Sequence, residues 1–111
     1  MKDINILKLT GTIYGEPKFG TGKSGTWASA KLKVQGDKYY QILPLSAYGA
    51  AGDALSKMKK DMQVHVEGEF EQAYQKPDSK EFPRYQAKVI YISELNQRDF
   101  NPEIGDDDIS F

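Results

Sequence analysis

The sequence has no cysteine and only one histidine among its 111 residues. The absence of cysteine excludes disulfide bonds, thiolate metal ligands and cysteine nucleophiles, and it suits a reducing cytoplasm. No apolar run approaches the roughly 18 residues that a membrane span needs. The first apolar stretch is short and contains Asn5 and Lys8, so we expect no secretory signal either. The composition therefore favours one small cytoplasmic domain with no membrane contact.

The sequence also lacks the common catalytic motifs. No HExxH, GxSxG, Walker or GxGxxG pattern occurs, and Gly20–Ser24 lacks the glycine spacing of a phosphate-binding loop and opens no helix. His65 lies on the polar side of a predicted strand, where a lone histidine is usually solvated. Glu67, Glu69 and Glu71 share one strand face, but no oxygen-ligand loop accompanies them. We expect no enzyme activity, no metal and no cofactor.

Neither sign of charge dominates the whole chain. Fifteen Lys and Arg residues stand against 16 Asp and Glu residues, for a formal net charge of −1, which taken alone argues against a nucleic-acid ligand. From Asn96 onward, however, one arginine stands against five acidic residues, so residues 96–111 carry −4 and residues 1–95 carry +3. We predict a folded domain over residues 1–95 and a disordered acidic tail over residues 96–111.

Alternating apolar and polar residues predict five strands in the body of the chain. They cover Ile4–Gly15, Thr26–Val34, Lys38–Tyr48, Met62–Phe70 and Tyr85–Leu95. The glycine-rich segment Phe19–Gly25 is expected to be a flexible connection. Between the third and fourth strands, Ala51, Leu55 and Met58 have helical spacing. This order predicts a mainly β fold, a five-stranded Greek-key barrel of the oligonucleotide-binding (OB) type.

The pattern also predicts details of these elements. Asp53 is expected in the first turn of the helix, and Lys57, Lys59 and Lys60 in its last turn, where they would complement the helix dipole. Phe70 is expected to point inward with the valines of its strand. Gly68, on the same inward side, is expected to let the strand bend, and Pro44 predicts a sheet edge or a bulge.

Several aromatic residues lie on the polar face of their predicted strands. Trp27 shares a face with Lys31 and Lys33, while Tyr40 and Tyr48 lie opposite the apolar side of the next strand. Single-stranded nucleic acid is bound by such a mixture, because unpaired bases stack on aromatic rings and ammonium groups neutralise phosphates. Subunit interfaces also favour tryptophan and tyrosine. The pattern alone leaves both kinds of surface open.

A series of short motifs, in chain order, resembles the bacterial and phage single-stranded DNA-binding proteins over nearly the whole chain. The motifs are Gly11–Pro17, Ala28–Val34, Tyr48-Gly49, Leu55–Lys60, Val64–Phe70 and Asp106–Phe111. The most specific is the last, Asp-Asp-Asp-Ile-Ser-Phe, which is close to the family's Asp-Asp-Asp-Ile-Pro-Phe terminus.

The resemblance implies sequence-independent binding of single-stranded DNA in replication, recombination and repair, in a bacterial cell or a phage-infected host. It implies a homo-oligomer, usually a tetramer. Tyr48 corresponds to a base-stacking aromatic of the family, and Tyr74 lies within about one residue of another. Trp27 is nominated from its face and its lysine neighbours alone. The predicted DNA-binding residues are Trp27, Lys31, Lys33, Tyr40, Tyr48 and Tyr74.

The resemblance also assigns a role to the end of the chain. In this family the terminal peptide docks on partner proteins, with its apolar residues in a pocket and its acidic residues against a basic rim. That role is carried onto Asp106, Asp107, Asp108, Ile109 and Phe111.

The chain departs from the family in three places. Ser110 replaces the proline, Asp61 replaces a glycine after the helix, and the linker of about ten residues (96–105) is unusually short. The short linker suggests a phage or mobile-element version and leaves a dimer as well as a tetramer open. The alternative function is an OB-fold protein-interaction or primosome-type adaptor whose exposed aromatics form a subunit interface.

Overall fold

Six strands and one short helix make up most of residues 2–95, the part of the chain that the computed structural model describes. In chain order they are β1 (Leu7–Ile13), β2 (Lys18–Gly22), β3 (Gly25–Gln35), β4 (Tyr40–Tyr48), α1 (Gly49–Ser56), β5 (Gln63–Gln72) and β6 (Tyr85–Glu94). The helix lies between the strands that correspond to the third and fourth predicted ones.

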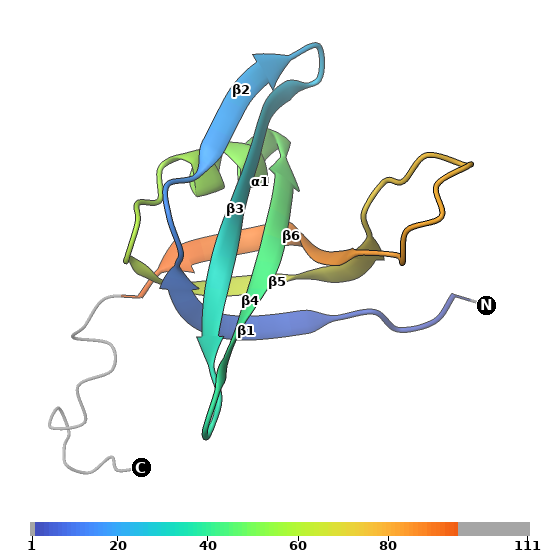
Figure 1. Cartoon of the computed structure of the whole chain (residues 1–111). Coiled ribbons are helices and arrows are strands. Elements are labelled where there is room, and N and C mark those ends of the chain that lie inside the picture. The colour runs from blue at the N-terminus through green and yellow to red at the C-terminus, as the bar shows by residue number, and fades with distance from the viewer. Residues whose placement is uncertain (1, 96–111) are drawn as a thin grey trace, which may run out of the picture.

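Five of the strands close into a ring in the order β1-β5-β6-β4-β3, because β1 also pairs with β3. All pairings are antiparallel except β4 with β6. In Figure 1, β3 and β4 cross the direction of β1, β5 and β6, as the two sides of a small barrel do. The mainly β OB-fold class with one short helix is confirmed. The β4–β6 pairing covers only Leu45 and Ser46, so Pro44 lies at an open part of the β4 edge, as predicted.

The core lies inside the ring and is built from one side of each of its strands. The fully buried large side chains are Ile13, Leu32, Leu45, Leu55, Val64 and Val66. Each of them stabilises the fold by about 1.5–3 kcal/mol relative to an exposed position. Because Leu55 comes from α1, which packs against β3, β4 and β6, the helix covers one opening of the barrel.

The register between β5 and β6 shifts at Gly68. Gly68 is buried, and a Cβ atom there would overlap the carbonyl group of Lys88. On β6 the shift leaves two consecutive residues, Ile90 and Tyr91, exposed between the buried Val89 and Ile92. This is a β-bulge, and it gives the strand the curvature that barrel closure needs. The predicted inward position of Gly68 is confirmed, and the absence of a side chain there allows the close approach of the β6 backbone.

The prediction that Phe19–Gly25 is only a flexible connection was wrong. Residues 18–22 form β2, a sixth strand. It pairs with β3 from Lys18 opposite Ser29 to Gly22 opposite Gly25. A two-residue turn at Lys23 and Ser24 joins the strands, and Gly25 adopts a φ of +105°. Glycine allows this left-handed conformation without a steric penalty, so the glycine-rich composition serves a tight hairpin.

Two other details also differ from the prediction. The helix begins at Gly49, so Asp53 lies beyond its first turn. It ends at Ser56, so Lys57, Lys59 and Lys60 lie after its last turn. The apolar spacing continues to Met58 because the turn after the helix packs on the core as well. Phe70 is 51% exposed and stacks on Tyr85 with ring centroids 5.0 Å apart. The Phe70 ring therefore packs on a neighbour that is itself 46% exposed, and not inside the core.

Asp61 links the helix to β5 with a φ of +69°, and its N–H donates to the carbonyl oxygen of Ile13. A left-handed conformation is costly for most L-residues and less so for Asp and Gly. We predict that Asp61→Ala lowers the free energy of unfolding by about 1 kcal/mol, whereas Asp61→Gly does not lower it. Urea denaturation of the three proteins measures this difference. An alanine variant as stable as the wild type would contradict it.

Candidate nucleic-acid interface

The register between β3 and β4 brings five of the six predicted DNA-binding residues onto one outer face. Trp27 pairs directly with Tyr48, and Lys31 and Lys33 lie four and six pairs further along the same ribbon, towards Tyr40. Strand β2 extends this face, because Lys18 pairs with Ser29 and Gly20 with Trp27. We call this surface the aromatic–lysine face. Its members are Lys18, Gly20, Trp27, Ser29, Lys31, Lys33, Gln35, Tyr40, Ile42, Pro44, Ser46 and Tyr48.

The three aromatic rings of this face are accessible to solvent. Trp27 is 41% exposed, Tyr40 51% and Tyr48 62%. All three lie on the outside because the alternate positions of the same strands, such as Ala28 and Ala47, fill the core. The rings therefore present apolar surface that the barrel itself does not cover.

The charged members of the aromatic–lysine face are all positive. They are Lys18, Lys31 and Lys33, and none of its other members is acidic. Lys88 on β6 adds a fourth ammonium group beside it, because Lys88 pairs with Ser46 of β4. Within residues 2–95 the ion pairs are His65–Glu67 and Arg84–Glu81, and neither uses these lysines. Their charge is available to an external anion.

Lys33 is held by a contact inside the face. Its Nζ lies 4.6 Å from the centroid of the Tyr40 ring, which is the geometry of a cation–π interaction. The contact places an ammonium group over an exposed aromatic ring before any ligand arrives. The contact thus places positive charge at the end of the face that contains Tyr40.

The outer side of β5 has the opposite character. It carries Glu67, Glu69 and Glu71, three carboxylates at alternate positions. His65 Nε2 donates a hydrogen bond of 2.8 Å to Glu67 Oε2, and this bond, aided by the charge of Lys8, lowers the pKa of the Glu67 carboxyl group. Glu71 accepts a 2.6 Å bond from Gln86. Two of these carboxylates therefore bind neighbouring side chains, and the barrel presents a basic side and a more acidic side.

Tyr74 is separate from the aromatic–lysine face, on the loop of residues 73–84 between β5 and β6. It is 86% exposed. The loop carries Lys76, Lys80 and Arg84 against Asp78 and Glu81, so it has one excess positive charge. Arg84, the last residue of the loop, precedes Lys88 by four residues, which corresponds to roughly 13 Å along an extended strand. The loop thus begins near the edge of the aromatic–lysine face.

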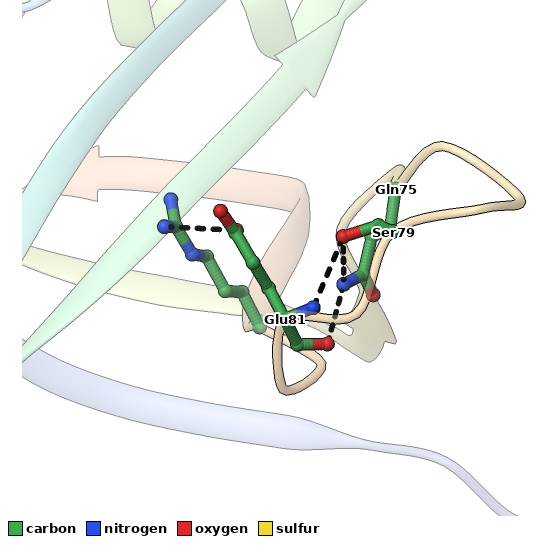
Figure 2. A network of polar contacts seen from close by, with 4 residues as sticks. Gln75, Ser79 and Glu81 are labelled. Carbon is green, nitrogen blue, oxygen red and sulfur yellow. Dashed lines mark hydrogen bonds and ion pairs between the residues drawn. The ribbon is translucent and has the colours of Figure 1, made fainter.

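Hydrogen bonds within this loop define its shape (Figure 2). The Gln75 side-chain amide donates to Ser79 Oγ at 3.1 Å and to the Glu81 carbonyl oxygen at 2.7 Å. The Glu81 N–H donates to the same Ser79 hydroxyl at 3.2 Å, and the Ala73 N–H donates to the Arg84 carbonyl oxygen at 2.9 Å. The exposed Arg84–Glu81 pair at 3.5 Å adds little. An open hollow forms beside Tyr74, lined also by Gln75, Lys76, Ser79, Glu81 and Arg84.

Sequence reasoning missed three residues of this region: Lys18, Gly20 and Lys88. Gly20 lies in the segment Phe19–Gly25 that was taken for a connection, and Lys18 comes immediately before it. The outward position of Lys88 follows from the burial of Ala87 and Val89 on either side of it. Its position beside Ser46, however, depends on the parallel β4–β6 pairing, which alternation does not specify.

Two further observations limit the chemistry of the described residues. Residues 2–95 contain no group of three His, Asp or Glu side chains placed to hold a metal ion. No helix in this part of the chain is long and apolar enough to cross a membrane. The predicted partner-binding residues, Asp106, Asp107, Asp108, Ile109 and Phe111, lie outside the described residues, as does the whole predicted tail.

The geometry can now be compared with known proteins. No protein-family profile matches the chain, and no curated protein matches it in sequence. Among solved structures, the chain is similar to the crystal structure of the small single-stranded DNA-binding protein from Streptomyces coelicolor. The two share 15% sequence identity with a TM-score of 0.72, over 88% of this chain and 97% of that one. The similarity shows that the two chains share a fold.

We predict that Gln75→Ala loosens the 73–84 loop without unfolding the barrel. The substitution removes two hydrogen bonds, each contributing about 1 kcal/mol, so trypsin cleavage after Lys80 should accelerate about thirtyfold. Mass spectrometry of timed digests measures the rates. Gln86→Ala is the matched control, because it removes one glutamine bond from the β5–β6 ribbon outside the loop. Equal cleavage rates in the two variants would contradict the prediction.

Proposed function

We propose that this protein binds single-stranded DNA without sequence preference, using the aromatic–lysine face. The observation that carries the proposal is the composition of that face. Three exposed aromatic rings and three lysines lie on the outer side of the paired strands β2, β3 and β4, and no member of the face is acidic. Stacking on rings and neutralisation of phosphates are the two interactions that non-specific single-strand binding requires. The solved structure of similar fold is that of a single-stranded DNA-binding protein, which supports the proposal.

Each residue type has a distinct role in this proposal. Trp27, Tyr40 and Tyr48 stack on bases, and each stacked base contributes about 1–3 kcal/mol whatever its identity. Lys31 and Lys33, with Lys18 and Lys88, neutralise phosphates. The other polar side chains of the face are one glutamine and two serines, too few to read base edges along a strand. Binding is therefore expected to tolerate any sequence.

Tyr74 extends the binding surface from the loop of residues 73–84. The hydrogen bonds of Gln75 keep the loop in one shape, so ordering it costs little when DNA binds. Lys76, Lys80 and Arg84 supply positive charge around the ring. The DNA strand would pass from the aromatic–lysine face, beside Lys88, to this loop.

The acidic end of the chain is proposed to recruit proteins of replication, recombination and repair. Asp106, Asp107 and Asp108 supply negative charge, while Ile109 and Phe111 supply apolar anchors beside them. The barrel is proposed to assemble as a dimer or tetramer in the bacterial or phage-infected cytoplasm. No catalytic step is assigned to the chain.

The proposal is tested by titrating the protein with fluorescein-labelled oligo-dT. Oligo-dT should quench Trp27, the only tryptophan, and affinity should fall with salt by about 0.7 in log–log slope for each phosphate neutralised. Lys31→Ala should reduce that slope by about 0.7, because it removes one phosphate contact. Lys57→Ala, which changes the charge equally just after the helix, is the control and should leave the slope unchanged.

The same experiment separates DNA binding from the adaptor function. Trp27→Ala and Tyr48→Ala should weaken oligo-dT binding and leave the molecular mass in light scattering unchanged. A changed mass with unchanged affinity would instead assign these rings to a subunit interface. Saturating oligo-dT that alters neither fluorescence nor mobility at low salt would overturn the proposed function.

We predict that deletion of Asp106–Phe111 abolishes capture of partner proteins and preserves or modestly raises affinity for oligo-dT. The deletion removes three negative charges that repel DNA, together with both apolar anchors. Pull-down from a host lysate and the oligo-dT titration measure the two effects. A chain with Phe111→Ala alone keeps the charge and should lose capture only. Lower DNA affinity after the deletion would contradict the prediction.

A further inference from the structure

Gly20 lies directly opposite Trp27 in the β2–β3 pair. A Cβ atom on Gly20 would lie 2.8 Å from Cζ2 of the indole and 2.9 Å from both Cε2 and Nε1. Contacts below 3.0 Å are essentially never made by a real Cβ atom. The indole therefore rests on the backbone of β2, in space that any side chain at residue 20 would occupy.

The backbone itself does not require a glycine at this position. The glycines with positive φ in the described chain are Gly15, Gly25 and Gly49, and Gly20 is not among them. A glycine inside a strand weakens it, because it loses more conformational entropy on folding and has no side chain to pack. The close approach of the indole is the feature of the structure that excludes a side chain there. An aromatic ring that covers a cross-strand glycine is a known way of stabilising such a strand.

The position of the indole also affects its other neighbour. Trp27 pairs with Gly20 on one side and with Tyr48 on the other, so the three residues form one row across β2, β3 and β4. Neighbouring aromatic rings gain stability by stacking on each other. Yet the aromatic pairs within residues 2–95 are Phe70–Tyr85 and His65–Tyr91, and Trp27–Tyr48 is not one of them. The indole leans toward β2 and leaves the Tyr48 ring 62% exposed.

From this geometry we propose that Gly20 is a positioning residue for DNA binding, an inference that rests on the proposed function. By accepting the indole on the β2 backbone, Gly20 fixes Trp27 in one orientation and keeps it apart from Tyr48. The two rings then act as separate stacking platforms for separate bases. A side chain at residue 20 would displace the indole from β2 and disturb one or both platforms.

The test compares Gly20→Ala with Gly22→Ala. Gly22 lies on the same strand and face, and a Cβ there would meet only the Gly25 carbonyl oxygen at an ordinary 4.0 Å, so it is a matched control. Gly20→Ala should raise acrylamide quenching of Trp27 in the free protein and weaken oligo-dT binding about tenfold, since part of one stacked base is lost. The salt slope should not change, because no phosphate contact is removed. Gly22→Ala should behave as the wild type.

A second pair of variants shows whether Gly20 acts through Trp27. In a Trp27→Ala background, Gly20→Ala should have no further effect on oligo-dT affinity, measured by anisotropy of the labelled oligonucleotide. An effect that persists in this background, or a Gly20→Ala protein that binds as the wild type does, would overturn the inference.

A measurement without substitution covers the case in which Gly20→Ala does not fold. Time-resolved anisotropy of Trp27 in the free wild-type protein should show no fast rotation independent of the barrel, and a freely rotating indole would overturn the inference. If the wild type fails to bind oligo-dT at all, the proposed function fails. The anisotropy then still reports whether Gly20 immobilises the indole, so the two failures are distinguishable.

Discussion

Strand β3 pairs with β1, β2 and β4, and most of the molecule depends on its register. Its inward positions supply Ala28 and Leu32 to the core, while its outward positions supply Trp27, Lys31 and Lys33 to the aromatic–lysine face. Because side chains alternate with a period of two, a shift of one residue would bury the lysines and expose the core. Burial of an unpaired ammonium group is far more costly than loss of a surface contact. The hydrophobic core therefore fixes the positions of the proposed binding residues as well, and the face needs no separate interactions to assemble it.

Closure of the barrel also places acidic and basic side chains on different strands of its surface. The bulge opposite Gly68 lies in the β5–β6 pair, and β6 separates the carboxylates on the outer side of β5 from the ribbon of β3 and β4. The ribbon of β3 and β4 pairs with the other side of the barrel at two places, β1–β3 and the short β4–β6 pairing, and the second places Lys88, a cation, beside Ser46. No acidic residue occupies a position of the aromatic–lysine face itself, although Glu16 borders it beside Lys18 and Lys31, and Glu69 lies opposite Lys88. The glutamine-centred bonds of the 73–84 loop complement this arrangement by giving a projecting loop a defined shape.

The sequence was sufficient to predict the elements in which local pattern and tertiary packing agree. Thr26–Val34 alternates without interruption, and the outward position of Trp27 and its lysines followed directly from that alternation. It was insufficient for β2, because glycine normally signals a loop, whereas here Gly25 permits a hairpin and Gly20 accommodates an indole from the next strand. Phe70 was misassigned for a related reason: parity gives the side of a strand but not where the barrel under it ends. The pairing of Lys88 with Ser46 could not be predicted either, because pairing between strands distant in the sequence produces no local periodicity.

The formal charge of −1 then has little bearing on whether the face attracts DNA. At physiological ionic strength, charges separated by more than about 8 Å of solvent are largely screened from one another. Lys31 and Lys33 are two residues apart on one side of β3, or roughly 7 Å, so a phosphate between them interacts with both. The carboxylates of β5 are separated from β4 by β6, and Glu69 lies opposite Lys88 on that strand. Neighbouring strands are about 4.8 Å apart, so β5 lies about 10 Å from β4 and about 15 Å from β3. A DNA strand on the aromatic–lysine face would therefore interact mainly with the nearby lysines, and little with the net charge of the whole chain. Association is governed by how the fold partitions charge among its surfaces, and here that partition follows from the register of β3.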